Sequence, residues 1–238
     1  MFFADVKYGD KPWQSLDINV TENSPKTIVY IHGGGLTDGD KRNAFEFREG
    51  LIREGYSVIS VNYRLYPQAK FPEFIDDCAE AFAFILRNCD HFGYGKNISA
   101  VGGSAGAYIL LMLLFDERYF TKVHISRNDF YAYIIDSAQP TTHFRVLEER
   151  HTEKNAIRVD DGSPLFFLKE YDVFPKLMLI TYEEDMFCRK EQNMMFSKVL
   201  ESYRIKHTFH ILEGKHCTGE YPDEKEEIRL VTLIKDFF

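Results

Sequence analysis

Short apolar runs alternate along the chain with segments whose apolar residues recur at helical spacing. Seven runs predict strands, at residues 16–20, 27–31, 56–61, 97–102, 131–135, 176–181 and 207–212. The intervening spacing predicts helices at 73–88, from 105 onward, at 191–203 and at 225–238. Alternation of this kind predicts an α/β fold, in which a mostly parallel sheet of about seven strands carries helices on both faces.

One stretch departs from the alternation. Residues 141–169 follow a strand, are rich in charge and have helical potential around 144–150. A connection this long is uncommon unless it has a function, so we expect a small cap insertion over the carboxyl edge of the sheet; the alternative is a disordered surface loop.

The 238 residues are 45% hydrophobic and contain no linker-like tract, which favours a single domain over residues 1–238.

Charge and cysteine content narrow the partners and the location. The net charge is −8 and no run of Lys or Arg occurs, so we expect no nucleic-acid partner. The longest apolar run, 107–115, is shorter than the roughly 20 residues that span a bilayer, and the first residues lack a secretory pattern. The four cysteines form neither a CxxC pair nor a metal-like cluster with His, which favours free thiols in the cytoplasm and no metal.

A candidate nucleophile lies in the segment Gly102-Gly103-Ser104-Ala105-Gly106, between an apolar strand and an apolar helix. The segment fits the G-x-S-x-G nucleophile elbow. Small residues permit a tight turn and a strained serine that presents its hydroxyl above the sheet. The backbone N–H of Ala105, at a helix N-terminus, would point at the substrate oxygen. The alternative is a glycine-rich turn with an idle serine.

A second glycine cluster, His32-Gly33-Gly34-Gly35, directly follows the strand at 27–31. Unshielded amides in such a loop can stabilise a developing oxyanion, so Gly33 and Gly34 are candidate donors beside Ala105. The loop lacks the G-x-G-x-x-G pattern and the P-loop lysine, which disfavours a phosphate site. We expect His32 to orient the loop.

A serine hydroxyl needs a base, and the base needs an orienting carboxylate. His216 follows the last predicted strand, on a loop that can return to the elbow. Asp185 follows the strand at 176–181, and the resulting order of Ser104, Asp185 and His216 is that of the α/β-hydrolases. Glu183 and Glu184 remain competitors for the acid. Among the other histidines, we expect the two in the last strand to be structural and the two in the insertion to be exposed: His207 and His210, and His143 and His151, respectively.

With these motifs in place, the chain resembles the hormone-sensitive-lipase-like group of α/β-hydrolase esterases. Further similarity lies in 61–72, with its Tyr63-Arg64-Leu65 step, in the helix that follows at 73–84, and in the serine–proline step at 162–165. The resemblance implies a triad of Ser104, Asp185 and His216 and an oxyanion hole from Gly33, Gly34 and Ala105. It also implies hydrolysis of carboxylic esters with small to medium acyl chains, without a cofactor.

Two departures from the group stand out. Gly103 precedes the nucleophile where the group often has aspartate. Only about 15 residues precede the first predicted strand, so we expect the first of the usual eight strands to be missing.

Four aromatic residues are candidate pocket residues because they lie near the insertion or near Asp185: Phe144, Phe166, Phe167 and Phe187.

Two alternatives to a carboxylesterase remain. An amidase, an arylformamidase or a small peptidase would use the same triad, so the expected partner is a small-molecule ester or amide. A non-catalytic binding protein on the same fold is the alternative from another class. Loss of a triad residue would be its usual signature, and the sequence keeps all three. The sequence gives no indication of an oligomeric state.

Overall fold

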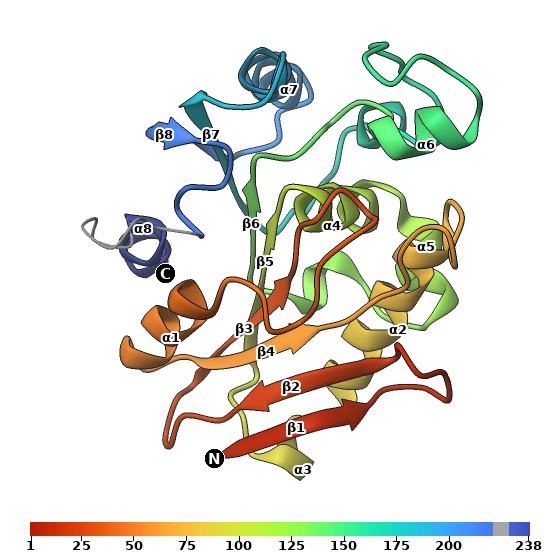
Figure 1. Cartoon of the computed structure of the whole chain (residues 1–238). Helices are drawn as coiled ribbons and strands as arrows, with labels where there is room; N and C mark the ends of the chain where they lie inside the picture. Colours follow the sequence, from red (N-terminus) through yellow and green to blue (C-terminus); the bar gives the residue numbers. More distant parts are fainter. Residues whose placement is uncertain (221–228) are drawn as a thin grey trace.

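The computed structural model describes residues 1–220 and 229–238, in which eight strands form one sheet with helices on both faces (Figure 1). The strands are β1 (Phe2–Lys7), β2 (Ser15–Asn19), β3 (Lys26–Ile31), β4 (Ser57–Val61), β5 (Asn97–Gly103), β6 (Ala132–Asp136), β7 (Lys176–Glu184) and β8 (Thr208–Lys215). The helices are α1 (Phe45–Arg53), α2 (Glu73–Arg87), α3 (Cys89–Phe92), α4 (Ala105–Phe115), α5 (Glu117–Lys122), α6 (Phe144–Glu149), α7 (Arg189–Ser202) and α8 (Arg229–Phe237), with short 3-10 turns η1 (Arg127–Asp129) and η2 (Pro164–Phe167).

The strand order is β1-β2-β4-β3-β5-β6-β7-β8. From β4 to β8 all neighbours are parallel, whereas β2 pairs antiparallel with both β1 and β4. The predicted class, a mostly parallel sheet with helices on both faces, is therefore confirmed, and each of the seven predicted strands occurs. Because the central strands are parallel, their carboxyl ends meet at one edge, where loop residues from several strands converge.

The expectation that the first strand is missing is wrong. β1 pairs with β2, with Phe2 opposite Asn19 and Phe3 opposite Ile18, so the sheet has eight strands and not seven. β1 is an edge strand with four of its six residues exposed, so it lacks the apolar alternation that marks a half-buried strand. Asp5 has a φ of 53° and the register shifts between Phe3 and Val6, which interrupts the pattern further.

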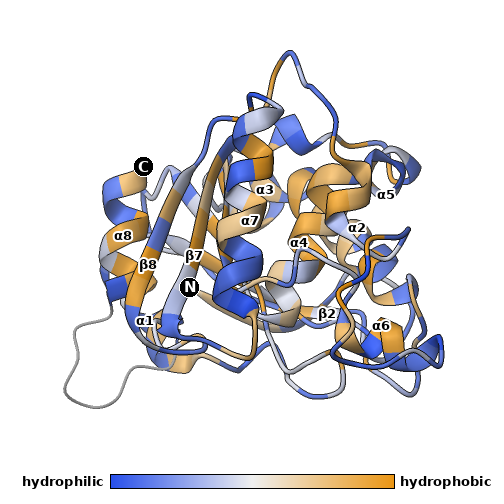
Figure 2. Ribbon diagram, turned by 90° about the horizontal axis from the view of Figure 1, so that it is seen from above, coloured by the Kyte–Doolittle hydropathy of each residue, from blue (hydrophilic) through white to orange (hydrophobic). Residues whose placement is uncertain are grey.

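Two helical layers cover the sheet. α1 and α8 pack on one face, and α2, α4 and α7 pack on the other, as Figure 2 shows from above. α4 is buried on all sides, so its sequence is apolar throughout and has no amphipathic stripe. This burial fixes the helix that begins directly after Ser104. In the ranges that the structure describes, no helix is both long and apolar enough to cross a membrane. Of the helix predicted at 225–238, residues 225–228 lie outside the described ranges.

The segment 141–169 is held by side-chain hydrogen bonds. Thr142 Oγ1 donates to Asp160 Oδ1 at 2.6 Å, which ties the two ends of the segment together. Glu149 Oε2 accepts from the Tyr66 hydroxyl and from the Phe71 backbone N–H, the latter at 3.0 Å. Figure 1 shows α6 beyond the end of β6, outside the sheet. The segment thus contains α6 and η2, and its role as a cap stays a prediction.

Candidate active site

The turn between β5 and α4 places Ser104 in a strained conformation. Its φ and ψ are 52° and −111°, a region that a serine rarely adopts. Its backbone N–H donates to Asp136 O at 2.8 Å, which ties the turn to β6. A Cβ added to Gly106 would lie 2.1 Å from Ile31 O, so only glycine lets α4 start this close to β3. The turn therefore aims the Ser104 hydroxyl away from the sheet.

Ser104, His216 and Asp185 meet in one hydrogen-bonded chain. His216 Nε2 lies 2.8 Å from Ser104 Oγ, and His216 Nδ1 lies 2.5 Å from Asp185 Oδ1. The three residues come from the carboxyl ends of β5, β7 and β8, which the parallel sheet brings together. A carboxylate only accepts hydrogen bonds, so Nδ1 carries the imidazole proton and Nε2 is free to accept from the serine hydroxyl.

The surroundings of Asp185 keep it ionised. Oδ2 accepts from the hydroxyls of Ser137 and Thr181, each at 2.8 Å, and Oδ1 accepts from the Met186 N–H at 2.7 Å. Burial acts to raise the pKa of Asp185, but the hydrogen bond and charge of His216, with the two hydroxyls, outweigh it and hold that pKa at about 2. The sequence reasoning did not anticipate Ser137 and Thr181, whose only signal is a small hydroxyl at or near a strand end.

The competing acids point elsewhere. Glu183 and Glu184 are both exposed, and Glu183 pairs with Lys190 at 2.8 Å. The register of β7 with β8 shifts between Tyr182 and Glu184, and the last pair is Glu184 with Lys215, just before Asp185. The geometry thus brings Asp185, and neither glutamate, to His216.

The glycine loop after β3 lies against the serine. A Cβ added to Gly33 would lie 3.3 Å from Ser104 Cβ, and Gly34 has a φ of 105°. Among the hydrogen bonds of the described residues, none uses the backbone N–H of Gly33, Gly34 or Ala105. His32 is buried and its Nδ1 donates to Gly33 O at 2.7 Å, while burial lowers its pKa to about 4. His32 therefore orients the loop as a neutral ring.

Two histidines in the insertion differ from each other. His151 is exposed, as expected, but His143 is only 1% exposed, so the expectation for His143 is wrong. His143 Nδ1 accepts from the Arg145 N–H at 3.2 Å at the start of α6, and its ring stacks on Phe144 at 4.3 Å. The ring is buried because it packs against Phe144 and against Tyr108, whose ring centroid lies 4.9 Å away, while its Nδ1 caps α6.

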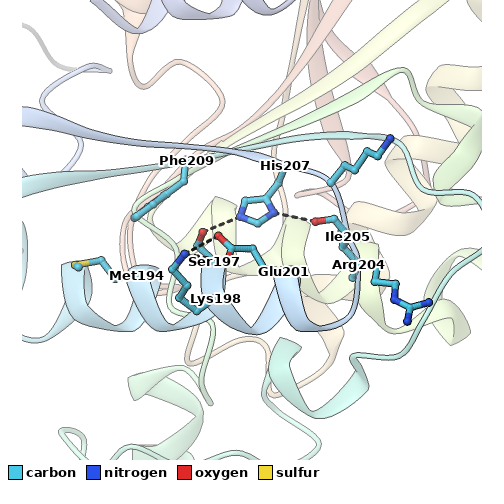
Figure 3. A pocket seen from close by; sticks show the side chains of 9 residues that line it. Met194, Ser197, Lys198, Glu201, Arg204, Ile205, His207 and Phe209 are labelled. Carbon is cyan, nitrogen blue, oxygen red and sulfur yellow. Dashed lines mark hydrogen bonds and ion pairs between the residues drawn. The ribbon is translucent and has the colours of Figure 1, made fainter.

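A second Ser–His pair lies between α7 and the start of β8. Ser197 Oγ is 2.7 Å from His207 Nε2, beside a surface cavity of about 630 Å³ (Figure 3). His207 Nδ1 donates to the Ile205 carbonyl at 2.9 Å, so no carboxylate orients this ring. Ser197 lies within a helix and not at a strained turn. The pair fastens α7 to the start of β8, in agreement with the structural role expected for His207.

A cavity of about 220 Å³ lies between the insertion and the loop after Asp185. Its walls include Phe144, Ile157, Phe187, Arg189 and Gln192. Of the four candidate pocket phenylalanines, Phe144 and Phe187 line this cavity, whereas Phe166 and Phe167 do not and pack on each other at 5.1 Å. The ring of Phe144 also lies 3.2 Å from where a Cβ on Gly35 would be, so it reaches the glycine loop. Phe144 therefore links the wall of the cavity to the glycine loop, although none of Ser104, Asp185 and His216 lines the cavity itself.

Asp136, Cys217 and Glu220 are the described residues whose donor atoms lie close enough together to hold a metal ion, within 4.8 Å of one another. Each carboxyl group already accepts a hydrogen bond from a tyrosine hydroxyl: Asp136 from Tyr182 at 3.1 Å and Glu220 from Tyr30 at 2.8 Å. Burial raises the pKa of the Cys217 thiol, which makes it a poor ligand and a poor nucleophile. We assign no metal to this cluster.

Comparisons with known proteins agree with the fold. A family model described as BD-FAE matches residues 16–182. A kynurenine formamidase from Scheffersomyces stipitis is 28% identical over 223 residues, which cover 85% of this chain and 79% of that protein. Esterase LipC from Mycobacterium tuberculosis is 31% identical over 110 residues, but these are 44% of this chain and 27% of LipC. Esterase B from Lactobacillus Rhamnosis shares the fold over 100% of this chain and 84% of that one, with a TM-score of 0.81 and 19% identity.

Proposed function

The chain belongs to the BD-FAE family and has the α/β-hydrolase fold of the hormone-sensitive-lipase-like esterases, and from this we propose that it is a serine hydrolase that cleaves carboxylic esters of small to medium acyl chains. The observation that carries the proposal is the unbroken chain of hydrogen bonds from Ser104 through His216 to Asp185. In this proposal the Ser–His–Asp chain is the catalytic triad, and the N–H groups of Gly33, Gly34 and Ala105 form the oxyanion hole.

The first half-reaction acylates the serine. Ser104 Oγ attacks the ester carbonyl carbon while His216 Nε2 takes the hydroxyl proton, across the 2.8 Å that separates the two atoms. Asp185 holds the ring and stabilises the imidazolium that forms. The negative charge moves to the carbonyl oxygen, where the backbone N–H groups stabilise it. Collapse breaks the bond to the alkoxy group, which leaves as the alcohol with the proton from His216.

The second half-reaction regenerates the enzyme. A water molecule attacks the acyl carbonyl, and His216 takes its proton as it took the serine's. The tetrahedral intermediate collapses with return of the proton to Ser104 Oγ and release of the carboxylic acid. Three free N–H groups in the oxyanion hole matter in both halves, because removing one such donor typically costs on the order of 100-fold in rate.

The insertion at 141–169 is, in our proposal, a small cap on this single-domain chain that shapes the substrate site. The cavity of about 220 Å³ between the insertion and the loop after Asp185 supports this role. A volume of this size suits a short acyl or alkoxy group better than a long chain. Phe144 and Phe187 give this cavity apolar surface, and four charged side chains also line it, so it suits a group with both apolar and polar parts.

A second candidate activity is amide hydrolysis, in particular of an arylformamide. The observation that favours it is the 28% identity to a kynurenine formamidase over most of both chains. The same triad would cleave either bond. Parallel measurements of kcat/KM on a p-nitrophenyl ester, on N-formyl-kynurenine and on an aminoacyl anilide decide between them: we expect the ester to be the best substrate, and preference for the formamide would replace our proposal.

A fluorophosphonate probe tests the proposal directly. We expect covalent labelling of Ser104, loss of that labelling in Ser104→Ala, and loss of turnover of p-nitrophenyl acetate or butyrate in the same variant. A wild-type protein that is folded but neither labelled nor active would point to the alternative of a non-catalytic binding protein.

The four cysteines are free thiols, which supports the cytoplasm as the proposed location.

A further inference from the structure

Two buried carboxyl groups lie beneath the strained turn, outside the Ser–His–Asp chain. Asp136 ends β6 and is 0% exposed, and Glu220 follows β8 and is 1% exposed. Neither carboxyl group has a nearby cation among the described groups that shift its pKa. Buried carboxyl groups without a cation are expensive, so their presence at this place needs an explanation.

Glu220 takes up the space beside the residue that precedes the nucleophile. A Cβ added to Gly103 would lie 2.0 Å from Glu220 Oε1 and 2.4 Å from its Cδ, and the three nearest atoms all belong to Glu220. The φ of Gly103 is not positive, so its backbone would accept a side chain. The first atoms that a side chain at position 103 would meet are therefore those of Glu220.

The same glutamate closes the turn that carries His216. The Glu220 N–H donates to Cys217 O at 3.0 Å, and the Gly219 N–H donates to the Tyr182 hydroxyl at 2.9 Å. Glu220 Oε2 accepts from Tyr30 on β3, while Oε1 has no hydrogen-bond partner among the described residues and faces Gly103. The Glu220 side chain, at the end of the turn from 216 to 220, thus contacts the nucleophile elbow and holds the turn in place.

The pair also reaches the triad acid. Ser137 Oγ lies 3.3 Å from Asp136 Oδ1 and 2.8 Å from Asp185 Oδ2. One hydroxyl therefore bridges the buried pair and the carboxylate that orients His216. The pair touches all three catalytic segments: the elbow through Gly103, the histidine turn, and the acid through Ser137.

We infer that Glu220 is a positioning residue: its buried carboxyl group, packed where a side chain at position 103 would lie, holds Ser104 and His216 at hydrogen-bonding distance. The inference rests on the proposed serine-hydrolase activity. Small displacements at such a site are costly, since a misplacement of about 1 Å can lower the rate about 100-fold. Glu220 touches no reacting atom and acts only through the two segments that it joins.

The charge of the pair decides whether this packing holds. Burial raises the pKa of Glu220 to about 7, against a smaller opposing effect of the Tyr30 hydrogen bond. Burial and the charge of Glu220 raise the pKa of Asp136 well above its usual range. Glu220 is therefore mostly neutral below pH 7, and above it this residue gains a buried negative charge beside the elbow. The other groups that face the pair or its turn from neighbouring elements are Tyr30, Tyr182, Asp185, Arg189, His216 and Cys217.

The main experiment moves the buried carboxyl group from position 220 to position 103. We expect Glu220→Ala to lower kcat on p-nitrophenyl acetate about 10- to 100-fold with KM nearly unchanged. The substrate still binds, but Ser104 and His216 no longer lie at hydrogen-bonding distance. Gly103→Asp alone should also lower kcat, because its Cβ collides with Glu220. The double variant, which places a carboxyl group from position 103 into the vacated space, should recover at least about tenfold over either single variant.

A pH series separates positioning from simple stability. Glu220→Gln keeps the shape but cannot ionise, so the ratio of its kcat to that of the wild type should rise between pH 6 and pH 8. Ile85→Ala is the matched control: it deletes a fully buried side chain of similar size in α2 and should lower stability without changing kcat. If Glu220→Ala does not fold, Glu220→Gln and Glu220→Asp carry the same comparison.

Three results would overturn the inference: an unchanged kcat in Glu220→Ala, no recovery in the double variant, or a pH-independent ratio for Glu220→Gln. A different result would refute the proposed function, so the two failures can be told apart. A wild-type protein without turnover or fluorophosphonate labelling would remove the serine-hydrolase activity itself, whereas an active wild type with a normal Glu220→Ala variant would remove only the positioning role.

Discussion

Replacing Asp185 with asparagine tests how the structure fixes the imidazole. In other triads this change turns the ring to the wrong tautomer, which lowers the rate about 10⁴-fold. Here the two oxygens of Asp185 have different partners. Oδ1 accepts from the Met186 backbone N–H at 2.7 Å, which can only donate, whereas Oδ2 faces the hydroxyls of Ser137 and Thr181, which can also accept, and receives only a longer contact of 3.4 Å from the Tyr182 N–H. An asparagine should therefore keep its oxygen at the Oδ1 position, toward His216.

With its oxygen so placed, asparagine still accepts from Nδ1–H of His216, and the productive tautomer survives. Only the charge is lost. A hydrogen bond to a charged group contributes about 1.5–3 kcal/mol and a neutral one about 0.5–1.5 kcal/mol. The difference, with some loss of charge stabilisation for the imidazolium, comes to about 2 kcal/mol, or about 30-fold in kcat/KM.

The assay is the kcat/KM of p-nitrophenyl butyrate hydrolysis for the wild type, Asp185→Asn and Asp185→Ala, with Ser104→Ala as the baseline. Alanine removes the hydrogen bond altogether, so we expect a loss of about 10⁴-fold. The reasoning is refuted if asparagine loses as much as alanine, because the Met186 N–H would then not control the orientation of the amide.

Further predictions concern the oxyanion loop, the cavity and the stability of the fold at low pH. Gly34→Ala should lower kcat at least about 100-fold and lower the melting temperature, since its Cβ would lie 2.0 Å from Asp38 O at a φ of 105°; an unchanged kcat would argue against Gly34 as a donor. Phe144→Ala should raise KM for the butyrate more than for the acetate, and equal effects would separate the cavity from the acyl group. The pKa of Asp185 is lowered to about 2, so its stabilising contribution is present above its usual value and is lost as the pH falls toward 2; acid unfolding of the wild type should show this loss and that of Asp185→Asn should not.

The resemblance to the hormone-sensitive-lipase-like esterases and the α/β fold were both available from the sequence, and both are confirmed. The seven predicted strands carry continuous apolar runs because central strands of a parallel sheet are buried on both faces. The eighth, β1, gave no such signal, because an exposed edge strand with a bulge buries too little to impose alternation. The boundaries of β7 and β8 also ran longer than their apolar cores, since their ends carry the polar residues of the site.

The sequence by itself determined which chemical groups this protein has and in what order they occur. The elbow glycines and the loop after β3 are local signals, because tight turns and close approaches demand glycine wherever they occur. It favoured Asp185 but left Glu183 and Glu184 as competitors, and it could not show that His143 is buried, because both questions depend on contacts between residues far apart in the chain. The tertiary structure alone decided that Asp185 faces His216, and that the space beside Gly103 is filled by a glutamate 117 positions later. Convergence of strand ends at one sheet edge is the physical reason: sequence distance carries no information about which loops meet there.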